Sequence, residues 1–295
     1  MRRRQLLASL AALISVPAVA DMAMPVVATF SVLGDMTTQI GGAAVAVNTL
    51  VGPDADVHTY QPTPGDLRAL MDAKLLVTNG LGLEGWLDRL TGAVTFQGTT
   101  VVAAAQVKPR TMTEAGGVAT TDPHAWQDPR NGVLYAEAIG AGLSTADASR
   151  ADAFQSAVRS YAAQIKTMDG WIETQFAPIP PERRRIITTH DAFGYYGARF
   201  GVEFLAPEGI STEFEPSAKA IAALVAQIRR EKIHAVFIEN MTSPRMVQML
   251  AQETGAILGG TVYSDALSPK DGPAATYLDM LRHNTRLFVA AMAGP

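Results

Sequence analysis

The chain has 295 residues, of which 48% are hydrophobic and none is cysteine, and its formal net charge is −4 at pH 7. This length exceeds that of one typical domain, so we expect two domains, each with its own core. The acidic balance without basic clusters argues against a nucleic-acid-binding protein, and the lack of cysteine excludes disulfides and thiolate metal sites.

The first twenty residues have the pattern of a secretory signal peptide. Three arginines at positions 2–4 precede the apolar segment Leu6–Val16, and small residues follow at 18–20. We therefore expect cleavage before Asp21. The apolar segment is much shorter than the ~20 residues that span a bilayer, and its arginines fit either the Sec or the twin-arginine export route. The expected mature protein is periplasmic and has no N-terminal cysteine to carry a lipid.

The first half of the mature chain alternates short apolar runs with helical patterns. Strands are expected at Pro25–Phe30, Val45–Val51, Leu75–Thr78 and Val101–Val107. Ser31 is placed to cap the first helix, and Thr63 followed by Pro64 is placed to open the second. The alternation predicts an α/β lobe over residues 21–144. The segment Pro109–Thr121 is rich in Thr, Gly and Ala, and is predicted to be a loop or flap.

A long helix is predicted to connect this lobe to a second one. From Thr145, an expected N-cap, to Phe176, apolar residues recur at steps of three and four without a proline, and Pro178 then ends the pattern. Further strands are expected at Arg185–Thr189, Val202–Ala206, Ala235–Glu239 and Leu258–Val262, with helices at Ser217–Lys232, Ser243–Gly255 and Ala274–Ala291. The predicted fold is therefore α/β: two lobes with mainly parallel sheets flanked by helices, 21–144 and 177–295, joined by the connecting helix 145–176.

Three of the five histidines and one aspartate lie in loops after strands or between prolines. His58 follows the second strand, His124 lies between two prolines, His190 follows the strand Arg185–Thr189, and Asp265 follows the last strand. Each lobe supplies two of them, which indicates a cleft between the lobes. Three imidazoles and one carboxylate suit a four-coordinate ion such as Zn2+. The spacing alone leaves a structural alternative, in which His58 is a hydrogen-bonded loop residue, His124 is a cap partner and Asp265 is a helix N-cap.

The sequence around these positions resembles the ligand motifs of the zinc/manganese-binding solute-binding proteins of bacterial ABC importers, the cluster A-I or cluster 9 family. The matching stretches, in the family's order, are Val57–Asp66, Asp122–Trp126, His190–Tyr195, Ser211–Ser217 and Val262–Asp265. The resemblance implies a metal held by His58, His124, His190 and Asp265 in the interlobe cleft. It also implies delivery of the metal to a membrane permease with an ATPase. Loading by a metallochaperone stays open, and we expect a monomer.

The resemblance and the ligand set favour Zn2+ over Mn2+. Manganese members of the family usually have glutamate where His190 stands, whereas zinc members usually have histidine. Many zinc members also have a histidine-rich acidic loop, which this chain lacks. Zinc binds sites of nitrogen and oxygen more tightly than manganese, which favours more oxygen ligands. Mn2+ is the alternative, and copper(II) would bind at least as well unless the site imposes a tetrahedral geometry.

Several carboxylates are candidates to support the ligand histidines. Candidate acceptors for the outer N–H groups of the ligand histidines are Asp128, Asp191, Glu213 and Glu239, each of which is otherwise a cap or a surface acid.

A zinc hydrolase is the rival function, because three histidines with an open fourth position activate water. Asp265 fills that position and no G-x-S-x-G motif is present, so we expect a binding protein without catalytic residues. A cell-surface adhesin is a third class.

Overall fold

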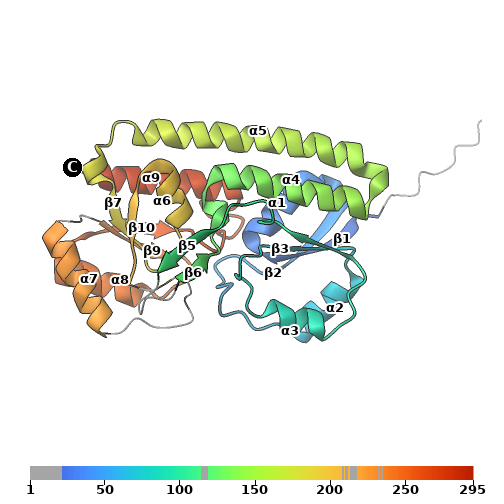
Figure 1. The fold of residues 1–295 in the computed structure, drawn as a ribbon, viewed down its shortest axis with the longest axis horizontal. Coiled ribbons are helices and arrows are strands. Elements are labelled where there is room, and N and C mark those ends of the chain that lie inside the picture. Colours follow the sequence, from blue (N-terminus) through green and yellow to red (C-terminus); the bar gives the residue numbers. More distant parts are fainter. Residues whose placement is uncertain are drawn as a thin grey trace, which may run out of the picture.

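The computed structural model describes residues 22–113, 119–207, 209, 212, 218–231, 233 and 235–294. These residues form two α/β lobes, and the long helix α5 (Ala151–Phe176) runs along both of them (Figure 1). The predicted fold of two parallel-sheet lobes with one long helix is confirmed. The expected signal peptide lies outside the described residues. None of the helices in the described part is both long and apolar enough to span a membrane.

Each lobe contains a four-stranded parallel sheet. The first sheet has the order β2-β1-β3-β4 and consists of β1 (Met24–Phe30), β2 (Val45–Val51), β3 (Leu75–Thr78) and β4 (Thr99–Val102). The second has the order β10-β9-β7-β8 and consists of β7 (Arg185–Ile187), β8 (Glu203–Leu205), β9 (Ala235–Glu239) and β10 (Ile257–Val262). Numbered within its own lobe, each sheet has the order 2-1-3-4. Both sheets therefore have a topological switch point between their first and third strands, where open α/β sheets bind ligands.

Helices cover both faces of the two sheets. The first lobe contributes α1 (Ser31–Gly41), α2 (Pro64–Asp72), α3 (Leu87–Gly92) and α4 (Pro129–Ala146). The second contributes α6 (Gly194–Phe200), α7 (Ala218–Glu231), α8 (Pro244–Thr254) and α9 (Tyr277–Ala293). In Figure 1, α4, α5 and α9 lie above the sheets, and α2, α3, α7 and α8 lie below them. The carboxyl ends of the strands are thus left to the loops between the lobes.

The connecting helix begins later than the sequence predicts. Thr145 lies inside α4, and α5 begins at Ala151, after a 3-10 turn at Ala148–Arg150. Asp147 separates the two helices, because its side chain accepts a hydrogen bond from the backbone N–H of Ser149 and so starts the turn. The end at Phe176 agrees with the prediction. With 26 residues and a rise of about 1.5 Å per residue, α5 is about 39 Å long and reaches along both lobes.

The predicted start of α2 is confirmed, whereas the predicted N-cap of α1 is wrong. Thr63 forms a capping box with Asp66 at the start of α2, and Pro64 is the first residue of that helix. Ser31, by contrast, is the first residue of α1, and Phe30 occupies the N-cap position. The Ser31 hydroxyl instead accepts a hydrogen bond of 2.9 Å from the backbone N–H of Leu267. Ser31 therefore links the first lobe to the segment that follows β10.

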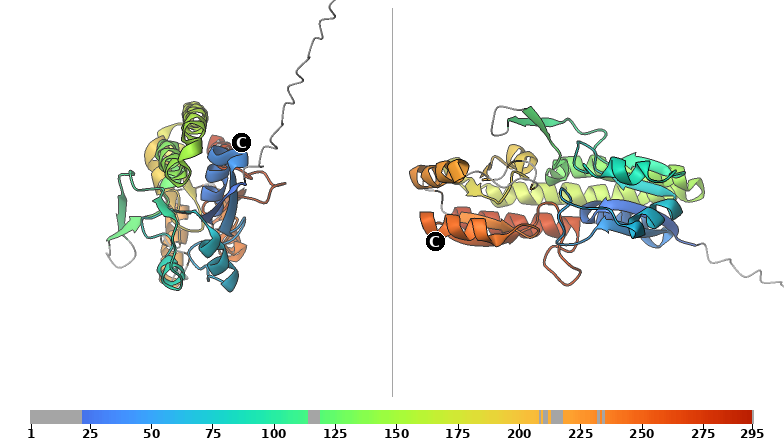
Figure 2. Two further views of the ribbon diagram at one scale, coloured as in Figure 1. Left: turned by 90° about the vertical axis from the view of Figure 1, so that its right-hand side faces the viewer. Right: turned by 90° about the horizontal axis from the view of Figure 1, so that it is seen from below.

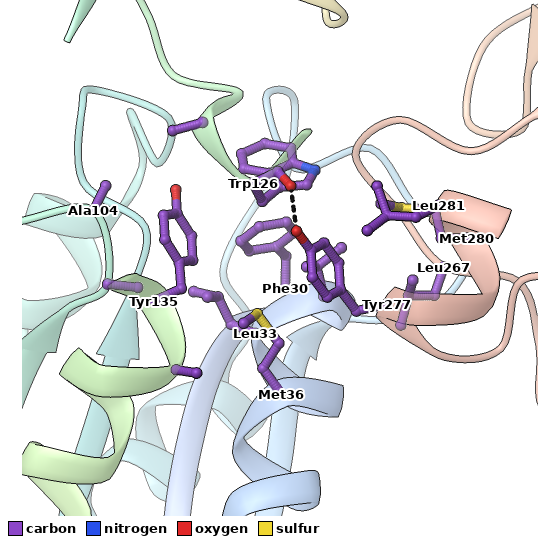
Figure 3. Packing of buried hydrophobic residues seen from close by; sticks show 14 of the residues in the cluster. Phe30, Leu33, Met36, Ala104, Trp126, Tyr135, Leu267, Tyr277, Met280 and Leu281 are labelled. Carbon is purple, nitrogen blue, oxygen red and sulfur yellow. Dashed lines mark hydrogen bonds between the residues drawn. The ribbon is translucent and has the colours of Figure 1, made fainter. Parts of the chain in front are cut away.

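One hydrophobic core continues from the first lobe into the second. Figure 3 shows Phe30 and Trp126 packed beside Tyr277 of α9. The Tyr277 hydroxyl donates a hydrogen bond of 2.6 Å to the backbone oxygen of Trp126 (Figure 3). The lobes are thus joined by a packed apolar seam as well as by α5.

The segment Pro109–Thr121, predicted to be a loop or flap, contains two strands. β5 (Arg110–Thr113) pairs antiparallel with β6 (Ala119–Asp122), and residues 114–118 lie outside the described residues. The physical reason is the threonine content, because β-branched residues favour extended backbone. The two strands project from one side of the molecule (Figure 2), and the backbone N–H of Arg110 donates a hydrogen bond to the hydroxyl of Tyr195 in α6. This segment therefore bridges the two lobes.

Candidate metal centre

The four side chains expected to be metal ligands converge on one point between the lobes. One ligand atom from each of His58, His124, His190 and Asp265 lies within 4.8 Å of the others. His58 follows β2, His124 follows β6, His190 follows β7 and Asp265 follows β10. The structure thus brings together residues that are as much as 207 positions apart in the sequence.

The distances between these atoms fit a small coordination shell. Asp265 Oδ2 lies 3.1 Å from His58 Nε2 and 3.1 Å from His190 Nε2. The Nε2 atoms of His58 and His124 are 3.3 Å apart. The edge of a tetrahedron around zinc, with bonds of about 2.0–2.1 Å, is about 3.3 Å long. The donor atoms are therefore spaced much as a tetrahedral ion requires.

Both oxygens of Asp265 face the imidazoles. Oδ2 approaches His58 and His190, while Oδ1 lies 3.5 Å from His124 Nε2. With one oxygen bound, the shell has four ligand atoms, and with both bound it has five. The carboxylate therefore fits tetrahedral zinc, and it also fits an ion that favours more oxygen ligands, such as manganese.

Burial separates one of the ligands from the other three. His124, His190 and Asp265 are fully buried, whereas 6% of the His58 side chain is exposed. His58 is thus the ligand nearest to solvent. The low dielectric around the other three strengthens their interaction with a cation.

Burial and charge act in opposite directions on the pKa values of the centre. Burial lowers the pKa of His124, but the carboxylates of Asp265 and Asp122 outweigh it and raise this pKa to about 9. Burial also opposes the charge of His190, yet Glu239 and Asp265 raise its pKa well above the usual value. Burial would raise the pKa of Asp265, but the two histidines hold it well below its usual range. In the absence of metal the centre therefore holds protons that an incoming cation must displace.

Two of the ligand histidines have a carboxylate behind the ring. Nδ1 of His124 lies 2.9 Å from Asp122 Oδ1, and Nδ1 of His190 lies 2.7 Å from Glu239 Oε2. A carboxylate at Nδ1 holds the proton on that nitrogen and directs Nε2 to the metal. Both rings are thus oriented for coordination through Nε2.

The four candidate supporting carboxylates have different outcomes. Glu239 lies against His190: its Oε2 is 2.7 Å from the ring Nδ1, and its Oε1 accepts the backbone N–H. Asp128 is instead the N-cap of α4, with an ion pair of 2.7 Å to Arg130, so this assignment is wrong. Asp191 interacts with the buried histidines through charge, and burial, followed by repulsion from Asp122, raises its pKa to about 6. Glu213 lies outside the described residues.

Two further carboxylates, Asp56 and Asp122, support the ligand histidines and are not among the four candidates named from the sequence. Each stands two residues before a ligand histidine, and its Oδ1 accepts the backbone N–H of that histidine, at 2.8 Å for His58 and 3.0 Å for His124. Asp56 also accepts a hydrogen bond from the hydroxyl of Thr212, which belongs to the second lobe. Aspartate commonly bonds the backbone two residues further on, so the repeated Asp-x-His spacing was the available signal.

The chain is similar to known metal-binding proteins over nearly its whole length. Residues 26–291 match the sequence model of the family described as "Zinc-uptake complex component A periplasmic", ZnuA. The manganese-binding lipoprotein MntA of Bacillus subtilis (strain 168) is 32% identical over 278 residues, which cover 92% of this chain and 91% of that protein. The zinc-binding protein TroA of Treponema pallidum (strain Nichols) is 31% identical over 281 residues, covering 94% and 91%. The iron-binding protein YfeA of Yersinia pestis is 31% identical over 256 residues, covering 87% and 82%.

Solved structures show the same fold. The periplasmic zinc-binding protein TroA from Treponema pallidum superposes with a TM-score of 0.86 at 29% identity, over 92% of this chain and 99% of that one. A manganese-bound periplasmic metal-binding protein from Candidatus Liberibacter asiaticus gives 0.81 at 30% identity, over 90% and 98%. The similar proteins thus share one architecture, although their names carry different metals.

Proposed function

We propose a specific metal for this chain, which belongs to the ZnuA family, the periplasmic metal-binding components of ABC metal uptake. The proposed function is capture of Zn2+ by His58, His124, His190 and Asp265, followed by delivery to a membrane permease. The observation that carries the proposal is the convergence of three imidazole nitrogens and one carboxylate within 4.8 Å between the two lobes. Three nitrogen ligands favour zinc over manganese in the usual order of affinity.

Manganese is the second candidate, for one specific reason. Both oxygens of Asp265 face the three imidazoles, which allows a fifth ligand atom. Manganese favours oxygen ligands and a higher coordination number, and MntA, a relative of similar identity to TroA, is named as a manganese-binding protein. The two candidates thus differ in how the Asp265 carboxylate binds.

A competition experiment distinguishes the two metals. The mature protein is stripped with a chelator and titrated with Zn2+ and Mn2+ against an indicator of known affinity. We expect zinc to bind more tightly, with one ion per chain. Tighter binding of manganese would overturn the zinc proposal, and absence of binding by either ion would overturn the metal-capture function. X-ray absorption of the loaded protein then reads the number of oxygen ligands.

We propose binding without catalysis, because Asp265 occupies the position that a hydrolase leaves open for water. We expect the zinc-loaded protein to have no metal-bound exchangeable water and no hydrolytic activity. A monomer that is released into the periplasm without a lipid anchor is likewise proposed. Fractionation of the producing cell tests that point, since MntA and several other similar proteins are named as lipoproteins.

A further inference from the structure

The backbone that carries Asp265 follows the last strand of the second sheet, yet the first lobe holds it. The backbone oxygen of Ser264 accepts two hydrogen bonds, from Trp126 Nε1 at 2.9 Å and from Gln127 Nε2 at 2.8 Å. Both donors lie in the short turn that follows His124, and all of these side chains are buried. One turn of the first lobe therefore presents a ligand of its own and also anchors Asp265.

Further anchors act on the residues just after Asp265. The backbone N–H of Leu267 donates to the hydroxyl of Ser31 at 2.9 Å, and the backbone oxygen of Leu267 accepts from the N–H of Asp54 at 3.1 Å. From the second lobe, Asn240 donates a longer bond of 3.3 Å to the backbone oxygen of Ala266. The segment Ser264–Leu267 is thus fixed mainly to residues that belong to the first lobe.

His190 is held in the opposite way. Its backbone N–H donates to Glu239 Oε1 at 2.9 Å, and its backbone oxygen accepts from the hydroxyl of Thr188 at 3.0 Å. The N–H of Glu239 in turn donates to the hydroxyl of Thr189. All three partners come from β9 and the loop after β7. The anchors of His190 therefore lie within the second lobe.

We propose that Trp126 and Gln127 are positioning residues for Asp265. Through Ser264 they make Asp265 part of a half-site with His58 and His124, so that three ligands form one preorganised group and His190 is the single ligand supplied by the second lobe. The inference rests on the proposed metal-binding function. Its physical basis is that ligands already held in place lose less conformational freedom when the metal binds.

Double-mutant cycles on zinc affinity test this role in the full mature protein. Trp126→Phe keeps an aromatic ring beside His124, whose ring centroid lies 5.4 Å away, but removes the N–H that Ser264 accepts. We expect about a tenfold loss of Zn2+ affinity in the wild-type background, as for other residues that orient a ligand. A positioning residue has no effect once its ligand is gone, so in Asp265→Ala the same change should cost less than about twofold. In His190→Ala it should again cost about tenfold.

Gln127→Met is the second variant, because it removes the other hydrogen bond to Ser264 with little change of volume. Its buried Oε1 has no hydrogen-bond partner among the described residues, so the change leaves no further group unsatisfied. It should couple to Asp265 in the same way as Trp126→Phe. Trp86→Phe is the matched control, since Trp86 is equally buried and its Nε1 donates to the backbone oxygen of Val57, beside His58.

The outcomes separate the positioning role from a general effect on folding. Trp86→Phe should cost the same affinity in Asp265→Ala as in the wild type. The inference is overturned if Trp126→Phe and Gln127→Met also lower zinc affinity by the same factor in Asp265→Ala as in the wild type. It is equally overturned if their coupling to His190 is as strong as their coupling to Asp265. Wild-type protein that binds neither Zn2+ nor Mn2+ would overturn the proposed function itself. Tight wild-type binding with additive cycles would overturn only the positioning role.

Discussion

The two sheets have the same strand order but use their switch points differently. In the second sheet, His190 follows the first strand of the lobe and Glu239 ends the third, so the switch point supplies a metal ligand and its carboxylate partner. In the first sheet the equivalent place holds Glu84, which accepts hydrogen bonds from the Thr29 hydroxyl and the Asn79 N–H. Neither of these two donors is among the converging ligands. The same topology thus provides a ligand in one lobe and a support in the other.

The support in the first lobe still reaches the metal centre. Asn79 donates from its side chain to the backbone oxygen of Pro123, the residue before His124, at 2.9 Å. It also accepts a hydrogen bond from the Tyr135 hydroxyl. The first switch point therefore holds the turn that carries His124, and the ligands of this lobe come from longer loops. Each switch point has its own buried glutamate, Glu84 in the first lobe and Glu239 in the second. Of these two, Glu239 contacts a ligand ring and Glu84 does not.

The largest expected effect follows from removing the ligand at the second switch point. His190→Ala should weaken Zn2+ binding by a factor of about 100 to 1,000, if a binding free energy of about 10–16 kcal/mol is shared among four ligands. The fold should remain, because the core of each lobe is untouched. Competitive titration and the far-UV circular dichroism of the variant provide the measurement. Unchanged affinity would show that His190 is not a ligand.

A matched pair of substitutions tests the contrast between the two glutamates. Glu239→Gln places an amide N–H next to His190 Nδ1 and so disfavours the tautomer that presents Nε2, and we expect zinc affinity to fall by about 10- to 100-fold. Glu84→Gln places an amide N–H toward the N–H of Gly80, which Glu84 Oε2 now accepts. It should lower the free energy of unfolding by about 1–3 kcal/mol and change zinc affinity less. Equal losses of affinity in the two variants would contradict the difference between the switch points.

The protons of the centre give a pH dependence. The pKa of His190 lies well above its usual value and that of His124 is about 9, so both rings are protonated near neutral pH without metal. Since the cation must displace these protons, zinc affinity should rise as pH rises toward about 9 and fall as pH falls. Each displaced proton changes the affinity about tenfold per pH unit.

Calorimetry in two buffers of different ionisation enthalpy counts the protons released on zinc binding. Glu239→Gln should release fewer protons, because the Glu239 carboxylate is the charge that raises the pKa of His190 most. The same count for Glu84→Gln should match the wild type. An affinity that does not change with pH would contradict the protonation of the centre.

The sequence predicts local features better than long-range ones. The four ligand positions are readable because each follows a strand or lies in a proline-bounded loop, and the capping box at Thr63 is a local pattern as well. The hydrogen bond from Trp126 to Ser264 joins residues 138 positions apart, and no local pattern predicts it. The sequence assigns two ligands to each lobe, because that assignment follows the order of the chain. The hydrogen bonds that fix the segment around Asp265 to the first lobe depend on tertiary packing, which the order of the chain does not reveal.

The smallest expected effect on metal binding concerns Asp128. This residue lies four positions after His124 in the sequence, but it pairs with Arg130 and not with a ligand histidine. Asp128 caps α4 by accepting a hydrogen bond of 2.9 Å from the Arg130 N–H. Asp128→Ala should cost about 1 kcal/mol of stability, or about 2 °C in Tm for a chain of this size, with zinc affinity unchanged. Asp122→Asn, six positions earlier, should weaken zinc binding about tenfold, because Asp122 contacts the His124 ring. If Asp128→Ala weakened zinc binding as much as Asp122→Asn, proximity in the chain rather than contact with the ring would decide which carboxylates support the metal.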